Sequence, residues 1–104
     1  MKEYKCSIIM SGYEGYTISS MMILNENDLE FLNRIAITLP FNNEDYSSIE
    51  FGVILLPDPI PDNTDTWFLN TPIKDINYII SSADPKIYEE FKMEWWYHYK
   101  EYKY

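Results

Sequence analysis

The apolar run from Ile49 to Leu56 limits most strongly what this chain can fold into. It is short and rich in β-branched and aromatic residues, which predicts a β-strand buried on both faces or nearly so. Gly52 lies in the middle of this strand, where a glycine is expected to mark a bulge or a close approach of another segment. We therefore expect this strand to lie in the core of the fold.

An acidic segment interrupted by prolines, residues 57–65, follows that strand directly. Its three prolines fix φ and remove backbone donors, which predicts a stiff, extended loop. The loop carries the carboxylates of Asp58, Asp62 and Asp65. A preorganised loop loses little entropy on binding, so we expect it to present these carboxylates as a fixed array.

The net charge of −9 is distributed unevenly along the chain. Residues 6–73 contain ten acids and one base, Arg34, and the remaining residues contain seven of each, so the first two-thirds of the chain account for the whole net charge. Such a field opposes contact with phosphate backbones, which argues against direct binding of DNA or RNA. A basic protein is the natural complement.

Length and composition predict a single globular domain over residues 1–104. The lone Cys6 cannot form an internal disulfide, and its place in an alternating pattern indicates a small buried hydrophobe. A reducing, cytoplasmic setting fits best. No run approaches the roughly 18 apolar residues of a membrane span, so no membrane association is expected. The surplus of Ile, Asn, Tyr and Lys suggests an AT-rich bacterial or phage genome.

Hydrophobic patterns predict further elements in the first half of the chain. Alternation over residues 4–10 and 16–24, joined by two glycines in a five-residue connection, predicts a β-hairpin. Residues 25–40 carry an apolar stripe at helical spacing and end at a proline. Asn25 and Asp28 have the spacing of a capping box, so we expect a helix there.

The second half of the chain is less regular. Residues 66–70 are expected to form a short strand, and residues 73–80 fit a helix or a strand equally well. Asp84 and Pro85 predict the start of a C-terminal helix whose apolar stripe docks on the sheet. The predicted fold class is α+β: a small antiparallel or mixed sheet, built from the hairpin and the central strand, with two to three helices packed on one face.

The other side of the predicted C-terminal helix is unusually aromatic, with Trp96, Tyr97 and Tyr104. Aromatic side chains are enriched in interface cores, so this side is expected to bind a partner or a second copy of the chain, giving a homodimer. The alternative is that the hairpin or the 66–70 segment covers it.

Catalytic and metal-binding constellations are weak. Cys6 and His98 are the single candidates for nucleophile and base, and Cys6 lies in a predicted core strand. Glu94, His98 and Glu101 share a helix face but have no second histidine to support zinc, and the acidic loop lacks the glycine and terminal glutamate of an EF-hand. The chain is therefore expected to be no enzyme and to hold no metal or cofactor.

These features together predict a small acidic inhibitor that binds a nuclease or a nucleic-acid-binding complex. Small size, strong acidity and an aromatic surplus are the character of phage-encoded anti-defence proteins such as anti-CRISPRs and anti-restriction DNA mimics. The residues expected to contact the partner are Glu44, Asp45, Glu50, Asp58, Asp62, Asp65, Trp96, Tyr97 and Tyr104. The alternatives are an immunity protein that neutralises a cognate nuclease toxin, and a small ligand-binding or regulatory domain in which the acids only aid solvation.

Overall fold

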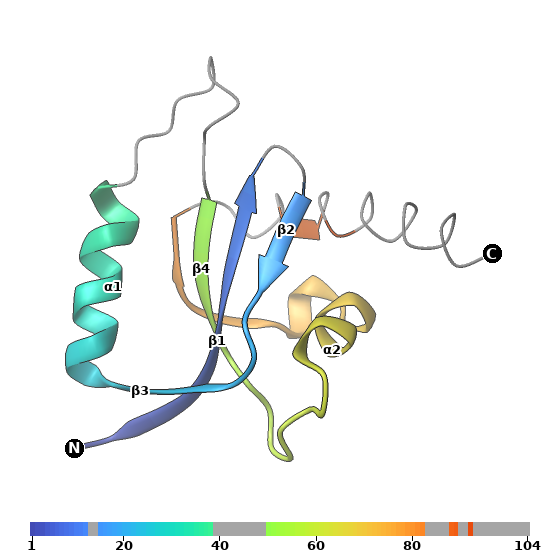
Figure 1. Cartoon of the computed structure of the whole chain (residues 1–104), viewed down its shortest axis with the longest axis horizontal. Helices are drawn as coiled ribbons and strands as arrows, with labels where there is room; N and C mark the ends of the chain where they lie inside the picture. Colours follow the sequence, from blue (N-terminus) through green and yellow to red (C-terminus); the bar gives the residue numbers. More distant parts are fainter. Residues whose placement is uncertain (13–14, 39–49, 83–87, 90–91, 93–104) are drawn as a thin grey trace.

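The computed structural model describes residues 1–12, 15–38, 50–82, 88–89 and 92 (Figure 1). They form an α+β fold built on a five-stranded antiparallel sheet, as the sequence predicts. In chain order the elements are β1 (Glu3–Gly12), β2 (Gly15–Ile18), β3 (Met22–Asn25), α1 (Glu26–Thr38), β4 (Glu50–Leu55), α2 (Thr64–Asn70), a 3₁₀ helix (Ile73–Asp75) and β5 (Asn77–Ser81).

The long strand β1 organises the sheet, whose order is β2–β1–β4–β5. On one side, β1 pairs with β2 near its C-terminal end and with β3 near its N-terminal end, so that Ile9 lies opposite Ile18 and Cys6 opposite Met22. On its other side it pairs with β4, where Cys6 lies opposite Leu55. The predicted hairpin is confirmed, with a break between β2 and β3.

Strand β4 is the buried central strand that the apolar run predicts. All four residues from Phe51 to Ile54 are buried. A Cβ added to Gly52 would lie 3.0 Å from Cγ2 of Ile9 and 3.3 Å from Cδ1 of Tyr78, so the glycine permits a close approach of both neighbouring strands. The irregularity in pairing falls just beside it, between Val53 and Ile54.

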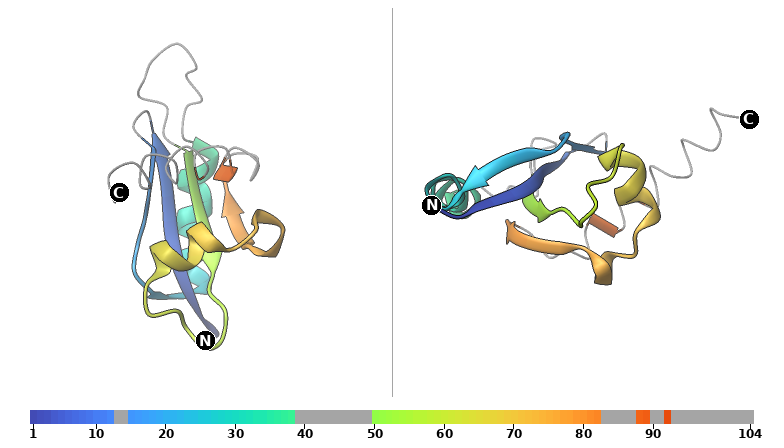
Figure 2. Two further views of the ribbon diagram at one scale, coloured as in Figure 1. Left: turned by 90° about the vertical axis from the view of Figure 1, so that its right-hand side faces the viewer. Right: turned by 90° about the horizontal axis from the view of Figure 1, so that it is seen from below.

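Alternation along the strands separates the core into two clusters on opposite faces of the sheet. One lies between the sheet and α1, and its buried members are Cys6, Leu24, Ala36, Phe51, Val53 and Ile80. The other includes α2, and its buried members are Ile9, Tyr16, Ile54, Phe68, Ile76 and Tyr88. Figure 2 shows α2 on one side of the strands and α1 on the other.

The prediction that the helices pack on one face is therefore confirmed only in part. Helix α1 covers the face of Phe51 and Val53, but α2 covers the opposite face, which Ile54 shares. A strand that is apolar at consecutive positions needs cover on both sides, and one helix can supply only one.

Helix α1 begins at the predicted capping box. The backbone N–H of Asn25 donates to Oδ2 of Asp28 at 3.0 Å, and the backbone N–H of Asp28 donates to Oδ1 of Asn25 at 2.9 Å. Leu29 and Leu32 pack against the core from this helix. The reciprocal bonds satisfy two backbone donors and fix where the helix starts.

The predicted strand at residues 66–70 is wrong, because these residues form most of α2. Oδ1 of Asn63 accepts the backbone N–H of Thr66 at 3.0 Å, which caps the helix. The helix then buries Phe68 completely. Asp65 consequently lies in the first turn of a helix and not on the extended loop.

The segment that fitted a helix or a strand equally well contains both. A single 3₁₀ turn at Ile73–Asp75 leads into the edge strand β5. Of the predicted C-terminal helix, residues 88, 89 and 92 are described, and they are helical. Tyr88, a member of the stripe expected to dock on the sheet, is fully buried. No helix in the described part of the chain is long and apolar enough to cross a membrane.

Candidate functional site

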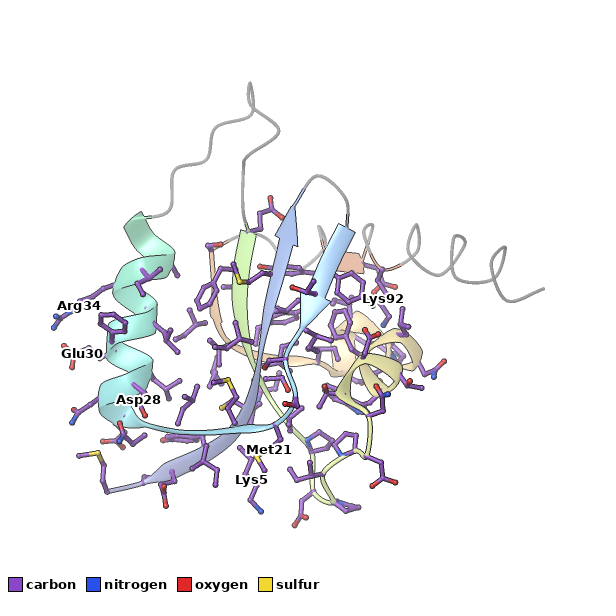
Figure 3. All side chains as sticks on the ribbon, in the orientation of Figure 1. Lys5, Met21, Asp28, Glu30, Arg34 and Lys92 are labelled. Carbon is purple, nitrogen blue, oxygen red and sulfur yellow. The ribbon has the colours of Figure 1, made fainter. Side chains whose placement is uncertain are left out.

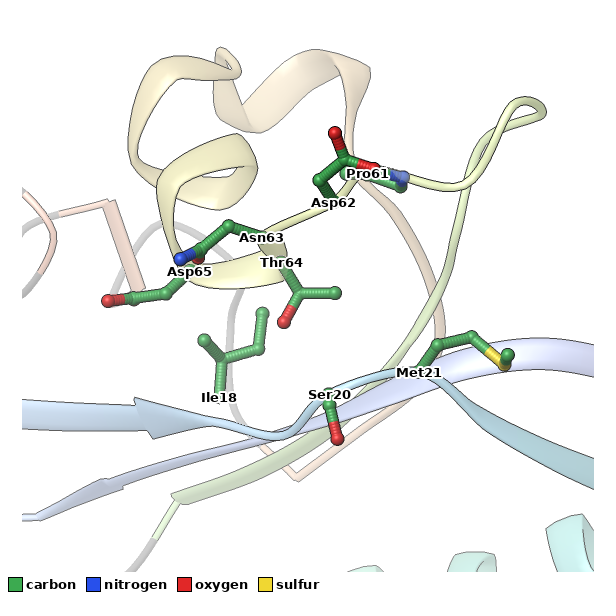
Figure 4. Close-up of a pocket in the computed structure, with 8 residues that line it drawn as sticks. All are labelled: Ile18, Ser20, Met21, Pro61, Asp62, Asn63, Thr64 and Asp65. Carbon is green, nitrogen blue, oxygen red and sulfur yellow. The ribbon is translucent and has the colours of Figure 1, made fainter.

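Two of the predicted contact residues, Asp62 and Asp65, line one surface pocket with a volume of about 470 Å³ (Figure 4). The first turn of α2 and the preceding loop form one wall, and the connection between β2 and β3 forms the other. Ile18, Met21 and Pro61 give this pocket an apolar lining beside the two carboxylates. The pocket thus combines negative charge with apolar surface.

Hydrogen bonds tie the two walls of this pocket together. Oγ1 of Thr64 donates to the carbonyl oxygen of Ser19 at 2.8 Å, which joins the start of α2 to the connection after β2. Ser19 is itself fixed to β1, since its Oγ accepts the backbone N–H of Ile8 at 2.8 Å and its N–H donates to the Ile8 carbonyl at 2.9 Å. The acidic segment is therefore held against the sheet.

The three acids of this segment differ in exposure. Asp58 and Asp62 are exposed, whereas Asp65 is partly buried beside Tyr16. Burial raises the pKa of the Asp65 carboxyl, and the neighbouring Tyr16 phenol offsets part of that rise. Burial also raises the pKa of Tyr16, and the neighbouring Asp65 raises it further. Asp58 and Asp62 are therefore the carboxylates of this segment that are available to a partner, whereas Asp65 is partly enclosed by the fold.

Glu50 does not belong to the same array. It lies at the first position of β4, opposite Ser11, while Asp58 follows the other end of that strand. A six-residue strand spans roughly 17 Å, so Glu50 lies at the opposite end of β4 from the acidic segment. Five further predicted contact residues fall outside the described residues: Glu44, Asp45, Trp96, Tyr97 and Tyr104.

A second group of exposed carboxylates lies at the start of α1. Glu26, Asp28 and Glu30 are all exposed, and Glu30 is bonded to Arg34 at 2.6 Å (Figure 3). Asp28 also accepts the capping bond from Asn25. The single base between residues 6 and 73 is thus paired with an acid on its own helix, and the base beside the start of the acidic segment is Lys5, whose backbone is bonded to Leu56.

Strand β3 and the residue before it connect these two acidic groups through exposed apolar side chains. Met21 is 39% exposed, Met22 37% and Ile23 55%. Met21 lines the pocket with Asp62 and Asp65, and β3 leads directly into α1. The sequence pattern missed this surface, because alternation predicts which residues share a face but not which face stays uncovered. A run of four apolar residues, MMIL, was the available signal.

A buried lysine in the described part of the C-terminal segment contacts the end of α2. Lys92 is 6% exposed, its Nζ donates to the carbonyl oxygen of Thr71, and it lies 5.1 Å from the centroid of the Phe68 ring. Burial lowers the pKa of Lys92, and Glu89 opposes that shift. Beside it the rings of Tyr78 and Tyr88 stack at 5.3 Å. These contacts indicate that Lys92 has a structural role.

Catalytic and metal-binding groups find little support among the described residues. Cys6 is completely buried beneath α1, and burial raises the pKa of its thiol, so it is a poor nucleophile. His98, Glu94 and Glu101 lie outside the described residues. Within the part of the chain that the structure describes, no three His, Cys, Asp or Glu side chains are grouped so that they could hold a metal ion.

Comparisons of this chain with protein-family models, with curated proteins and with solved structures find no match.

Proposed function

We propose that this protein is an acidic inhibitor that binds the basic groove of a nuclease or another nucleic-acid-handling defence enzyme, as phage anti-defence proteins do. One observation carries the proposal. Exposed carboxylates lie near both ends of the apolar strand β3, with Asp62, which lines the pocket beside Met21, near one end and Glu26 and Asp28 at the other. An apolar centre with a charged rim is the usual anatomy of a protein interface.

The charge distribution supports a basic partner. Among the described residues from 6 to 73 the only base is Arg34, and Glu30 already pairs with it. A negative potential that is not neutralised internally attracts a positively charged cleft and raises the association rate, most strongly at low salt. Phosphate backbones would be repelled by the same potential, which favours a protein as the partner.

The rigidity of the acidic segment supports tight binding. Its prolines restrict the backbone, Asn63 caps the helix that follows, and Thr64 bonds to Ser19 across the pocket. Carboxylates on a segment held in this way lose little conformational entropy when a partner binds. Fixed spacing of negative charge is what a mimic of nucleic-acid phosphates requires.

Affinity capture tests this proposal. The tagged full chain is incubated with a bacterial lysate at about 50 mM NaCl and washed at about 300 mM, where surface charge pairs are well screened. We expect one basic nuclease or nucleic-acid-binding complex to be retained, released by the salt wash, and inhibited by the added protein. Retention of no basic protein, or of one whose activity is unchanged, would refute the proposal.

A pair of matched variants tests the acidic segment within that experiment. Asp58→Asn with Asp62→Asn removes two exposed charges from the proposed surface, and we expect association about threefold to tenfold slower with unchanged stability. Asp75→Asn, compared with Asp62→Asn alone, removes one exposed charge that lies outside both acidic groups. Equal slowing in both variants would mean that net charge, and not this segment, governs association.

The pocket is the observation that favours a second candidate, a small ligand-binding or regulatory domain. Its volume of about 470 Å³ lies within the range of about 300–1,000 Å³ that small-molecule sites occupy. A thermal shift with small cationic ligands or divalent cations, in the absence of any protein partner, would favour this candidate. An immunity protein would use the same acidic surface, and the presence of a neighbouring toxin gene would distinguish it from an anti-defence protein.

A further inference from the structure

The outer edge of β3 has backbone groups that face away from the sheet. The carbonyl of Lys5 accepts the backbone N–H of Leu56 at 2.9 Å, so the backbone groups of Lys5 are directed toward β4. Those of Ile8 are directed to the other side, toward Ser19. Since this direction alternates along a strand, Tyr4 and Cys6 are directed toward β3.

The register then determines which residues of β3 remain available. Leu24 lies opposite Tyr4 and Met22 opposite Cys6, so these two bond to β1. Ile23 lies between them and directs its N–H and carbonyl outward. Among the described residues no strand pairs with this edge. The outward N–H of Asn25 is already bonded to Asp28, so Ile23 is the central pairing position.

The side chains of this edge lack the usual protection. Edge strands of soluble proteins are commonly blunted by lysine, proline or inward-pointing charges. Strand β3 contains no charged residue and no proline, and Met21, Met22 and Ile23 are exposed. Lys5, which lies opposite Ile23, is the nearby base on β1. The edge offers two outward hydrogen-bonding groups together with apolar contact area.

The acidic side chains at the two ends of this edge favour pairing with a basic segment. Met21 adjoins Asp62 at the pocket, and Asn25 adjoins Asp28 at the start of α1. Met21 and Asn25 are four positions apart, which is roughly 13 Å of extended chain. A strand laid along the edge would therefore meet a carboxylate at each end if it carried basic residues about four positions apart.

We infer that β3 binds an extended basic segment of the partner by strand addition. This inference rests on the proposed function and specifies its contact surface. The backbone of the segment pairs with Ile23, apolar side chains at its centre pack on Met21, Met22 and Ile23, and its basic side chains pair with the acids at either end. Complementary charge therefore selects the segment, and backbone pairing fixes its register.

Two peptides of identical composition test the spacing. The full chain, labelled with ¹⁵N, is titrated with GSKVTVKSG, in which the lysines are four positions apart, and with GSVKTKVSG, in which they are two apart. We expect the first peptide to shift the Ile23 amide resonance, slow its hydrogen exchange and bind at least about threefold more tightly. Equal binding of both peptides, or shifts confined to other elements, would overturn the inference.

Two variants test the edge itself. Ile23→Pro removes the outward N–H without breaking a bond to β1, and prolines are tolerated at such edge positions. We expect it to reduce binding of GSKVTVKSG at least about fivefold, whereas Ile23→Val, which retains the N–H and an apolar side chain, should bind like the original chain. Lys5→Gln removes the adjacent base and should tighten binding about twofold. Unchanged binding by Ile23→Pro would overturn the inference.

Sedimentation of the unmodified chain measures whether a second copy of the chain, and not a partner, pairs with β3. A dimer that Ile23→Pro converts to a monomer would mean that a second copy covers β3, which would overturn the inference. The proposed function fails separately: capture of a basic enzyme by Ile23→Pro and by the original chain alike would leave the inhibitor proposal standing and reject only the strand-addition surface.

Discussion

Replacing Gly52 with alanine should destabilise the fold through a single methyl group. The new Cβ would lie 3.0 Å from Cγ2 of Ile9, which is fully buried, and 3.3 Å from Cδ1 of Tyr78. The first distance is shorter than ordinary van der Waals contact, so Ile9 or β4 must move. Overpacking of this kind costs about 1–3 kcal/mol. The lower entropy of alanine in the unfolded chain offsets about 0.4–1 kcal/mol of that cost.

The expected net loss is therefore about 1–2 kcal/mol, which corresponds to a fall in Tm of roughly 4–16 °C for a domain of this size. Urea unfolding followed by circular dichroism measures it, with an unchanged m-value showing that the fold is intact. Ile9→Leu removes the Cγ2 methyl, so in the double variant it should recover at least about 0.5 kcal/mol beyond additivity. A Gly52→Ala protein as stable as the original would refute the close-packing explanation.

Two further predictions concern the start of α2. Asn63→Ala removes the oxygen that accepts the Thr66 N–H and should lower the free energy of unfolding in urea by about 1 kcal/mol. Asn63→Asp should retain the cap and the original stability. Equal stability of all three proteins would contradict this assignment. Burial raises the pKa of Asp65 above its ordinary value of 3.8, so folding favours the protonated carboxyl. The contribution of this carboxyl to the free energy of unfolding is therefore complete below pH 3.8 and is lost as the pH rises through the folded-state pKa. Asp65→Asn, which cannot ionise, should therefore gain stability relative to the original chain between pH 4 and pH 7, and a relative loss over that interval would contradict this assignment.

Elements with strong local signals were predictable from the sequence. The capping pair Asn25 and Asp28 fixes the start of α1 through bonds between neighbours in sequence. The apolar run of β4 and the two glycines that end β1 and begin β2 act in the same local way. These signals do not depend on how distant segments pack.

Helix α2 was not predictable on the same basis. Seven residues with threonine and aromatic side chains have weak helix propensity, and such residues also suit a strand. The helix forms because Asn63 caps it and because Phe68 fills the uncovered face of the sheet beside Tyr16. The packing of Phe68 is a tertiary contact, so it can be predicted only when the face of the sheet that α1 leaves uncovered is known.

The candidate site was likewise predicted only in part. The sequence identified the acidic segment, and the structure brings Asp62 and Asp65 to one pocket while it separates them from Glu50. Exposure of Ile23 depends on which side of β1 the strand β3 occupies, and no local pattern encodes that choice.

Competition between this protein and DNA tests the central claim most directly. The captured enzyme is saturated with a fluorescently labelled DNA duplex, and the protein is added while the anisotropy of the duplex is recorded. If the acidic surface occupies the nucleic-acid groove, one equivalent of the protein should displace the duplex, and the Asp58→Asn, Asp62→Asn variant should require several-fold more. A ternary complex, in which the enzyme holds duplex and protein together, would contradict inhibition by charge mimicry.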